Sequence, residues 1–159
     1  MLSDDELSIA AKSTMKIGID SYCYHRYFGE VYAQQSPPPR QMTLEGFIER
    51  AHELQVDGVS LESCFIPRFD RDYLLSIKDI LDRYGMDRVY AWGHPDGLEA
   101  GRNESAYEEM IASFERARNI GAPVMRVVGS SLMFRHEPHE PQIERLSRMF
   151  GDAVKVAAD

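Results

Sequence analysis

The chain has 159 residues, 43% of them hydrophobic, a size that suits one globular domain with an apolar core. Its 18 basic and 26 acidic residues give a formal net charge of −8, which repels nucleic-acid phosphates and anionic membranes. Because the chain shows neither an apolar run of membrane-spanning length nor a signal-peptide pattern, we expect a cytoplasmic protein that binds no nucleic acid and no membrane.

The N-terminal part of the chain contains a weakly patterned leader, a strand and a long connection. We expect residues 1–14 to be frayed, with the folded domain covering residues 15–159. The first predicted strand, residues 16–20, is followed by a connection that runs to residue 42 and is rich in aromatic and basic side chains. A connection of this length is typical of a lid or binding loop, although its rings are equally suited to capping the core.

Three further strands and four helices are predicted after this first strand. The strands start near residues 59, 89 and 124, and each is short, apolar and followed by a loop. The helices are recognised by apolar residues at helical period and by their starting signals, which are Thr43, Asp70 or Asp72, the Ser105–Glu108 capping box and Pro141. Alternation of this kind predicts a parallel α/β sheet with right-handed crossovers.

Two parallel architectures are compatible with the alternation: an open doubly wound sheet and part of a TIM barrel. No glycine-rich phosphate fingerprint follows the first strand, which counts against a dinucleotide-binding sheet. An open sheet covered on both faces should be apolar on both, whereas these strands have one apolar parity and one polar or bulky parity. We therefore favour the barrel, with the second parity facing its axis: Asp20, Ser60, Glu62, Tyr90, Trp92, His94 and Arg126.

Three segments resemble the xylose-isomerase-like TIM barrels. Residues 15–20, 51–62 and 118–126 are similar to the first, second and fourth units of that superfamily, which includes sugar-phosphate isomerases and epimerases, dehydratases and nucleases. The resemblance implies four βα units over residues 15–159, the N-terminal half of a TIM (β/α)8-type barrel. It also implies a sugar or sugar-phosphate isomerase or epimerase that moves a proton next to a carbonyl.

The same resemblance implies a divalent metal ion, Mn, Mg, Co or Zn, as the cofactor. Members of the superfamily bind it through side chains of the second half-barrel, so we predict that this chain supplies no metal ligand. Two alternatives to the isomerase stay open: a dehydratase or lyase acting on a cyclic polyol or keto-sugar, and a non-catalytic half-barrel. Metal titration separates a complete enzyme site from a remnant.

The chain would supply one wall of the sugar site. Glu62 and His94 are the predicted catalytic residues, although Glu62 is equally suited to an internal ion pair with Arg126, and His94 to a satisfied histidine at the strand end. Aromatic faces with a few polar groups suit a polyol ring. The predicted substrate-binding residues are Tyr22, Tyr24, His25, Arg26, Trp92, Arg126 and Arg135.

A half-barrel has two open edge strands and an uncovered inner face. We expect that face to expose Tyr90, Trp92 and Val128, a large apolar patch for a monomer. The chain is therefore predicted to pair, either with a second copy or with a complementary half-barrel, and to be inactive when isolated.

Overall fold

The computed structural model describes residues 15–95, 97–129 and 135–158, so the predicted leader lies outside the described residues. The elements, with their bounds in chain order, are β1 (Gly18–Asp20), η1 (Ser21–Phe28), α2 (Leu44–Glu53), β2 (Gly58–Glu62), η2 (Ser63–Phe65), α3 (Arg71–Arg83), β3 (Asp87–Trp92), α4 (Glu104–Ile120), β4 (Val124–Val127) and α5 (His139–Ala157).

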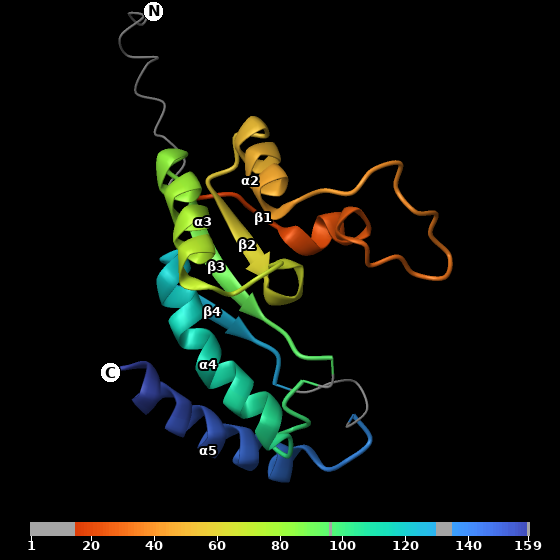
Figure 1. Ribbon diagram of the computed structural model, residues 1–159. Coiled ribbons are helices and arrows are strands. Elements are labelled where there is room, and N and C mark those ends of the chain that lie inside the picture. The colour runs from red at the N-terminus through yellow and green to blue at the C-terminus, as the bar shows by residue number, and fades with distance from the viewer. Residues whose placement is uncertain (1–14, 96, 130–134, 159) are drawn as a thin grey trace, which may run out of the picture.

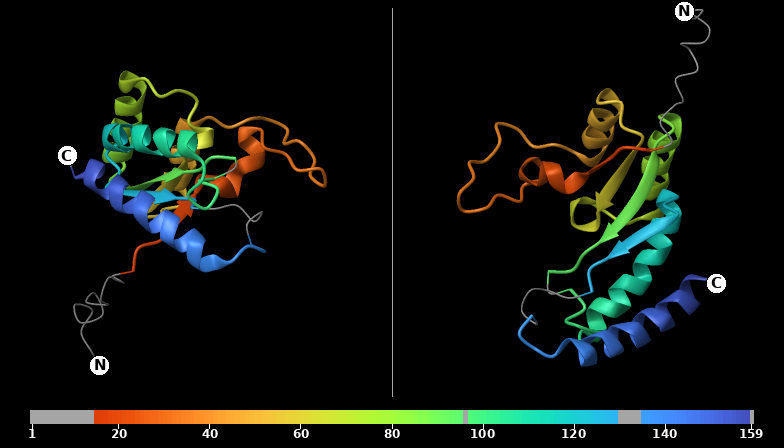
Figure 2. Two further views of the ribbon diagram at one scale, coloured as in Figure 1. Left: turned by 90° about the horizontal axis from the view of Figure 1, so that it is seen from below. Right: turned by 180° about the vertical axis from the view of Figure 1, so that it is seen from behind.

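The four strands form one parallel sheet in the order β1-β2-β3-β4. Helices α2 to α5 lie on one face of this sheet, and the opposite, inner face carries no described helix (Figures 1 and 2). The predicted α/β class and the four βα units are confirmed. Among the described helices, none is long and apolar enough to cross a membrane.

Capping side chains set the starts of the helices largely as predicted. The Thr43 hydroxyl accepts a hydrogen bond from the Gly46 N–H at 3.1 Å, and the Asp70 carboxylate accepts one from the Tyr73 N–H at 3.0 Å. The start of α4 differs from the prediction, because Asn103 rather than Ser105 is its cap. The Asn103 side-chain oxygen accepts from the Ala106 N–H at 3.0 Å, and Ser105 donates its hydroxyl to that same oxygen.

The hydrophobic core lies between the sheet and the helices. It is contributed mainly by the apolar stripes of α2, α3 and α4 and by the helix-facing residues of the strands. The largest fully buried side chains are Trp92, Tyr90, Phe47, Leu44, Ile48, Leu61, Leu74, Ile77, Leu81, Leu98, Met110 and Ile120. Burial of this apolar area is the main term that stabilises the fold.

The orientation predicted for β3 is wrong. Glu62 is aligned with Ala91, and Ala91 with Arg126, so Ala91 faces inward while Tyr90 and Trp92 face the helices. Both rings are fully buried, and the Trp92 indole N–H donates to the Glu109 carboxylate on α4. Because large rings bury more apolar area under helices than on an uncovered face, this orientation is the more stable one.

Candidate functional site at the strand ends

Three charged side chains meet on the inner face at the carboxyl ends of the strands. They are Asp20 from β1, Glu62 from β2 and Arg126 from β4. The Arg126 Nη2 donates to Glu62 Oε1 and lies 3.8 Å from Asp20 Oδ2. The Glu62 side chain is only 12% exposed, whereas that of Arg126 is 47% exposed. One guanidinium therefore bridges two carboxylates at the place where parallel α/β proteins build their sites.

Hydrogen bonds between loops hold the ends of β1, β2 and β3 together. The buried Ser21 hydroxyl accepts from the Glu62 backbone N–H at 2.9 Å, which ties the end of β1 to the end of β2. The Ser63 hydroxyl accepts from the Gly93 N–H at 3.3 Å, which links β2 to the end of β3. The backbone around Glu62 is therefore fixed from both sides.

The surroundings of Glu62 raise the pKa of its carboxyl above the ordinary value. Burial is the largest cause, because it disfavours the charged form. The positive charge of Arg126 lowers the pKa and the negative charge of Asp20 raises it, and the net direction is upward. A carboxyl whose pKa is raised by burial at a strand end is a candidate for proton transfer.

This pKa shift predicts a pH-dependent effect of Glu62→Gln. Because the pKa of Glu62 is higher in the folded than in the unfolded chain, the folded state binds more protons between the two values. The stabilisation is thus fully present below the ordinary carboxyl pKa, about 4, and is lost as pH rises through the folded-state value. We expect the free energy of unfolding of the parent, relative to the variant, to fall with pH across this window in urea titrations.

The matched control for this experiment is Glu53→Gln, which changes an exposed carboxylate on α2 far from the cluster. A difference between the parent and Glu62→Gln that stays constant with pH would contradict the raised pKa of Glu62.

The connection between β1 and α2 forms a compact aromatic cluster. The Tyr22 ring stacks on His25 at 5.2 Å and on Phe65 at 6.0 Å between ring centroids. The hydroxyls of Tyr22 and Tyr32 both donate to the Glu30 carboxylate, at 3.1 and 2.8 Å. Tyr22 stays 41% exposed, so its ring is available to a ligand next to the end of β1.

Other predicted substrate-binding residues have different surroundings. The Tyr24 ring packs edge-on against Phe47 of α2 at 5.6 Å, which fits the capping alternative for the aromatic connection. The Arg26 guanidinium donates to the Ser36 carbonyl oxygen at 2.5 Å. Trp92 faces α4 and not the charged cluster, which corrects its expected position in the sugar pocket. Arg135 is exposed in the segment before α5.

The His94 side chain lies beside Trp92 and not beside Glu62. Its ring lies 6.5 Å from the Trp92 ring, with an angle of 24° between the planes, and its carbonyl oxygen accepts from the Gly97 N–H at 2.8 Å. The prediction that His94 points inward assumed that Tyr90 and Trp92 face the barrel axis. In the structure these two residues face the helices instead. The structure thus groups Glu62 with Arg126 and Asp20, and holds His94 on the neighbouring loop.

Asp20 of the cluster and the neighbouring Ser21 were not predicted as site residues. Asp20 was expected to face the barrel axis, but it was not among the predicted site residues. Ser21 carried no signal, because a serine after a strand is usually part of an ordinary turn. Its position beside Glu62 depends on the pairing of β1 with β2, in which Asp20 is aligned with Ser60.

A divalent metal ion does not fit this cluster. Among the described residues, no three side chains of His, Cys, Asp and Glu are grouped so that they could hold a metal ion. The cluster has two carboxylates, and Arg126 contacts both. The guanidinium therefore supplies the positive charge that a bound cation would otherwise bring.

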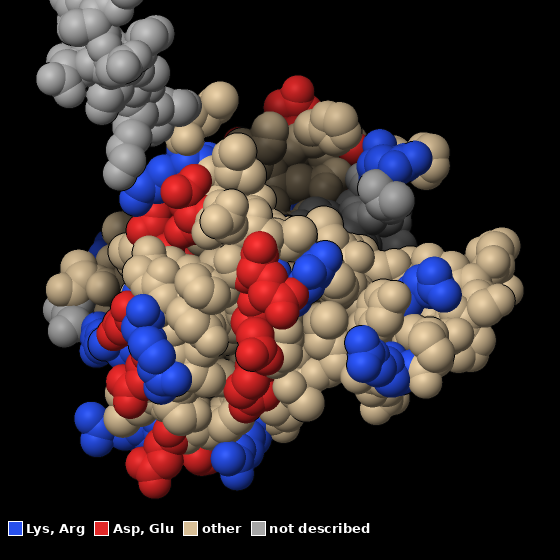
Figure 3. Space-filling view, turned by 90° about the horizontal axis from the view of Figure 1, so that it is seen from above, with Lys and Arg blue, Asp and Glu red and all other residues tan. Residues whose placement is uncertain are grey.

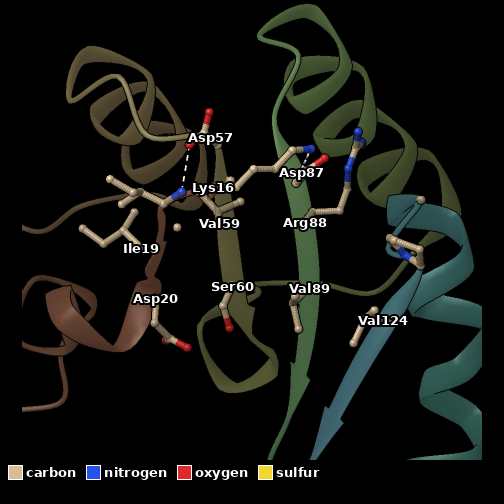
Figure 4. Close-up of a pocket in the computed structure, with 15 residues that line it drawn as sticks. Lys16, Ile19, Asp20, Asp57, Val59, Ser60, Asp87, Arg88, Val89 and Val124 are labelled. Carbon is tan, nitrogen blue, oxygen red and sulfur yellow. Dashed lines mark hydrogen bonds and ion pairs between the residues drawn. The ribbon is translucent and has the colours of Figure 1, made fainter. Parts of the chain in front are cut away.

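A cavity of about 650 Å³ lies on the inner face (Figure 4). It extends from Asp20 and Ser60 toward the N-terminal ends of the strands, where Val124 begins β4 and Lys16 forms an ion pair with Asp87 at 2.5 Å. In a closed barrel this region is filled by side chains, and ligands bind at the opposite end. The cavity therefore marks an uncovered barrel interior, and the candidate site lies at its C-terminal end.

The surface charges show no concentrated basic region on the face drawn in Figure 3. Asp and Glu side chains form a row there, and the Lys and Arg side chains are scattered around it. The acidic row agrees with the formal net charge of −8.

Comparison with known proteins reveals a structural likeness without a sequence match. No protein-family model and no curated protein matches the chain. A D-psicose 3-epimerase from Clostridium cellulolyticum H10, solved with D-tagatose, superposes with a TM-score of 0.68 and 15% identity, over 91% of this chain and 49% of that chain. An L-ribulose 3-epimerase has a TM-score of 0.63 and 17% identity, over 90% and 46% of the two chains.

A xylose isomerase domain protein from Planctomyces limnophilus has a TM-score of 0.60 and 18% identity, over 90% of this chain and 50% of that chain. The chain thus spans about half the length of the structures that it matches. At these identities the likeness concerns the fold.

Proposed function

We propose that this chain, which has the fold of the N-terminal half of a xylose-isomerase-like TIM barrel, forms one wall of the site of a sugar isomerase or epimerase. Its structural neighbours include epimerases of the ketoses D-psicose and L-ribulose. The observation that carries the proposal is the partly buried Glu62 at a strand end, with a raised pKa and with Arg126 beside it.

In this proposal Glu62 transfers the proton. Its carboxylate takes a proton from the carbon next to the sugar carbonyl. The electron pair of that C–H bond forms the C=C bond of an enediolate as the carbonyl π pair moves onto the oxygen. A second group gives a proton to the same carbon or to its neighbour; we assign no residue to this role, because His94 lies on the loop after β3 with its ring beside Trp92. The divalent ion implied by the fold family would have its ligands outside the described residues, and we assign it no step here.

The neighbouring side chains orient the substrate and the base. Arg126 holds one oxygen of Glu62, so it fixes the direction of the free oxygen and donates to a sugar hydroxyl from its exposed side. The exposed part of the Tyr22 ring, beside the end of β1, contacts the sugar carbons. Arg26 and Arg135 are our candidates for binding the phosphate of a sugar phosphate, because both carry a positive charge.

Titration of the isotopically labelled chain with sugars tests the proposal. We expect D-fructose and D-tagatose to shift the backbone amide signals of Glu62, Tyr22 and Arg126, with Kd values on the order of millimolar. Glu62→Gln should weaken this binding, and the exposed Glu53→Gln should not.

myo-Inositol serves as the competing ligand in the same titration. Tighter binding of myo-inositol would favour the alternative of a dehydratase or lyase for cyclic polyols. The absence of shifts with every sugar at about 100 mM, well above a millimolar Kd, would contradict a sugar site on this wall.

A further inference from the structure

The sheet has two open edges. β1 pairs only with β2, and β4 pairs only with β3 within the described residues. The two edges lie on opposite sides of one parallel sheet, and each presents backbone N–H and C=O groups that a further strand would satisfy. Proteins normally cover such edges, so the side chains beside each edge strand indicate what kind of surface would cover it.

Beside β4 lies an apolar groove of about 630 Å³, on the helix side of the sheet between α4, β4 and α5. Met125 and Val127 of β4, Phe114 of α4, and Phe150 and Val154 of α5 are among its lining residues. Val154 is 68% exposed although it belongs to the apolar stripe of α5. The groove is therefore a surface that lacks its apolar partner.

The edge of β1 presents apolar side chains on the same side of the sheet. Gly18 is aligned with Gly58 on the inner face, so Ile17 and Ile19 point to the helix side. Ile17 is 64% exposed, and Figure 4 shows Ile19 on the side of β1 away from β2.

The backbone of Ile17 is held in place by one neighbour. Its N–H donates to the Asp57 carboxylate at 2.8 Å, and its carbonyl oxygen accepts from the Asp57 N–H at 2.7 Å. The exposed isoleucine is therefore presented at a fixed position on the sheet edge.

The two edges complement each other. The isoleucines of the β1 edge are apolar, like the groove at the β4 edge, and both lie on the helix side of the sheet. The charged side chains of the inner face do not contribute to this match, because Asp20 of β1 and Arg126 of β4 already lie 3.8 Å apart within one copy. Because β1 and β4 are the two outer strands of the sheet, β1 does not form backbone hydrogen bonds with β4 of the same copy.

We propose that a second copy of this chain docks on these edges, with β1 of each copy beside β4 of the other. Two four-stranded sheets then close into an eight-stranded parallel barrel around a twofold axis. Ile17 and Ile19 of one copy enter the β4 groove of its partner, and the two inner cavities face each other. This inference stands independently of the proposed sugar chemistry.

Analytical ultracentrifugation of the purified chain tests the pairing. We expect a species of twice the 18.2 kDa chain mass at micromolar concentration. Val154→Glu places a charge in the groove and should weaken association at least about tenfold, since transferring a charge into an apolar contact is costly. Val156→Glu is the matched control, because Val156 is also exposed on α5 but does not line the groove.

Circular dichroism should show that both variants stay folded, since both positions are exposed. A cooperatively folded monomer at all concentrations would overturn the proposal and leave the groove to a different half-barrel. Equal weakening by Val154→Glu and Val156→Glu would overturn the proposed position of the interface.

Directional cross-linking tests the arrangement of the two copies. Cys23 and Cys64 are free and exposed, so both are first replaced by Ser. Ile17→Cys and Val154→Cys are then introduced into separate preparations, which are mixed and treated with a short bismaleimide. We expect cross-linked dimers in the mixture and few in either preparation alone. Efficient cross-linking of Ile17→Cys to itself would contradict the pairing of β1 with β4.

Discussion

Trp92→Ala should lower the free energy of unfolding by about 3–5 kcal/mol, the range for truncating a large buried aromatic side chain. Trp92 is fully buried between β3 and α4, so the substitution leaves a cavity in the core. It also removes the indole N–H that donates to Glu109, a carboxylate that Arg116 contacts at 2.5 Å. Because Trp92 is the only tryptophan, urea unfolding should be followed by circular dichroism.

Phe69→Ala is the control for this substitution. Phe69 is 39% exposed, and its ring is covered by the Arg116 guanidinium at 4.1 Å, so we expect a loss of less than about 1.5 kcal/mol from this partial burial. Equal losses for Phe69→Ala and Trp92→Ala would show that Trp92 is not packed as described. Since Trp92 faces away from the charged cluster, we also expect its fluorescence to be insensitive to bound sugar.

Gly101→Ala should be the most disruptive of the conservative substitutions, with an expected loss of about 2–4 kcal/mol from backbone strain and steric overlap together. Gly101 has a φ of 82°, which side chains rarely tolerate, and an added Cβ would lie 2.7 Å from the Cβ of Arg145. The Arg145 Nε donates to the Ala100 carbonyl oxygen at 2.9 Å, so α5 and this loop cannot separate without losing that bond.

Gly85→Ala separates the two contributions to this loss. Gly85 has a comparable φ of 63°, but no atom lies within 4 Å of an added Cβ. We expect a loss of about 1 kcal/mol there, from the left-handed backbone alone. Thermal unfolding of both variants measures the difference, and equal losses would contradict the close approach of α5 to Gly101.

Local features of the fold were predictable from the sequence because their causes lie within a few residues. The cap at Thr43 depends on a hydroxyl three residues before the N–H that it binds. The end of α4 at Gly121 depends on a backbone φ of 73°, which glycine adopts without strain. Alternating strand and helix patterns then favoured four βα units, and the structure confirmed them.

The site was only partly predictable. The sequence indicated that Glu62 and Arg126 lie on inward-facing positions of their strands, and an ion pair between them was one of two open alternatives. Their contact spans 64 positions in the chain and needs the curvature of a sheet in which β2 and β4 are not neighbours. The contact of Arg126 with Asp20 also needs this curvature, since Asp20 lies on β1, the edge strand opposite β4.

By itself, the sequence determined the elements and their order, because periodicity and capping act locally. Strand parity and the resemblance to the xylose-isomerase-like barrels then indicated the parallel half-barrel. Only the tertiary structure decided which way β3 faces. Its residues Val89, Tyr90, Ala91 and Trp92 are apolar or aromatic at both parities, so alternation carries no polarity signal there. Pairing with β2 and β4 set the register, and burial of the Tyr90 and Trp92 rings under the helices outweighs the alternative because it removes more apolar area from water.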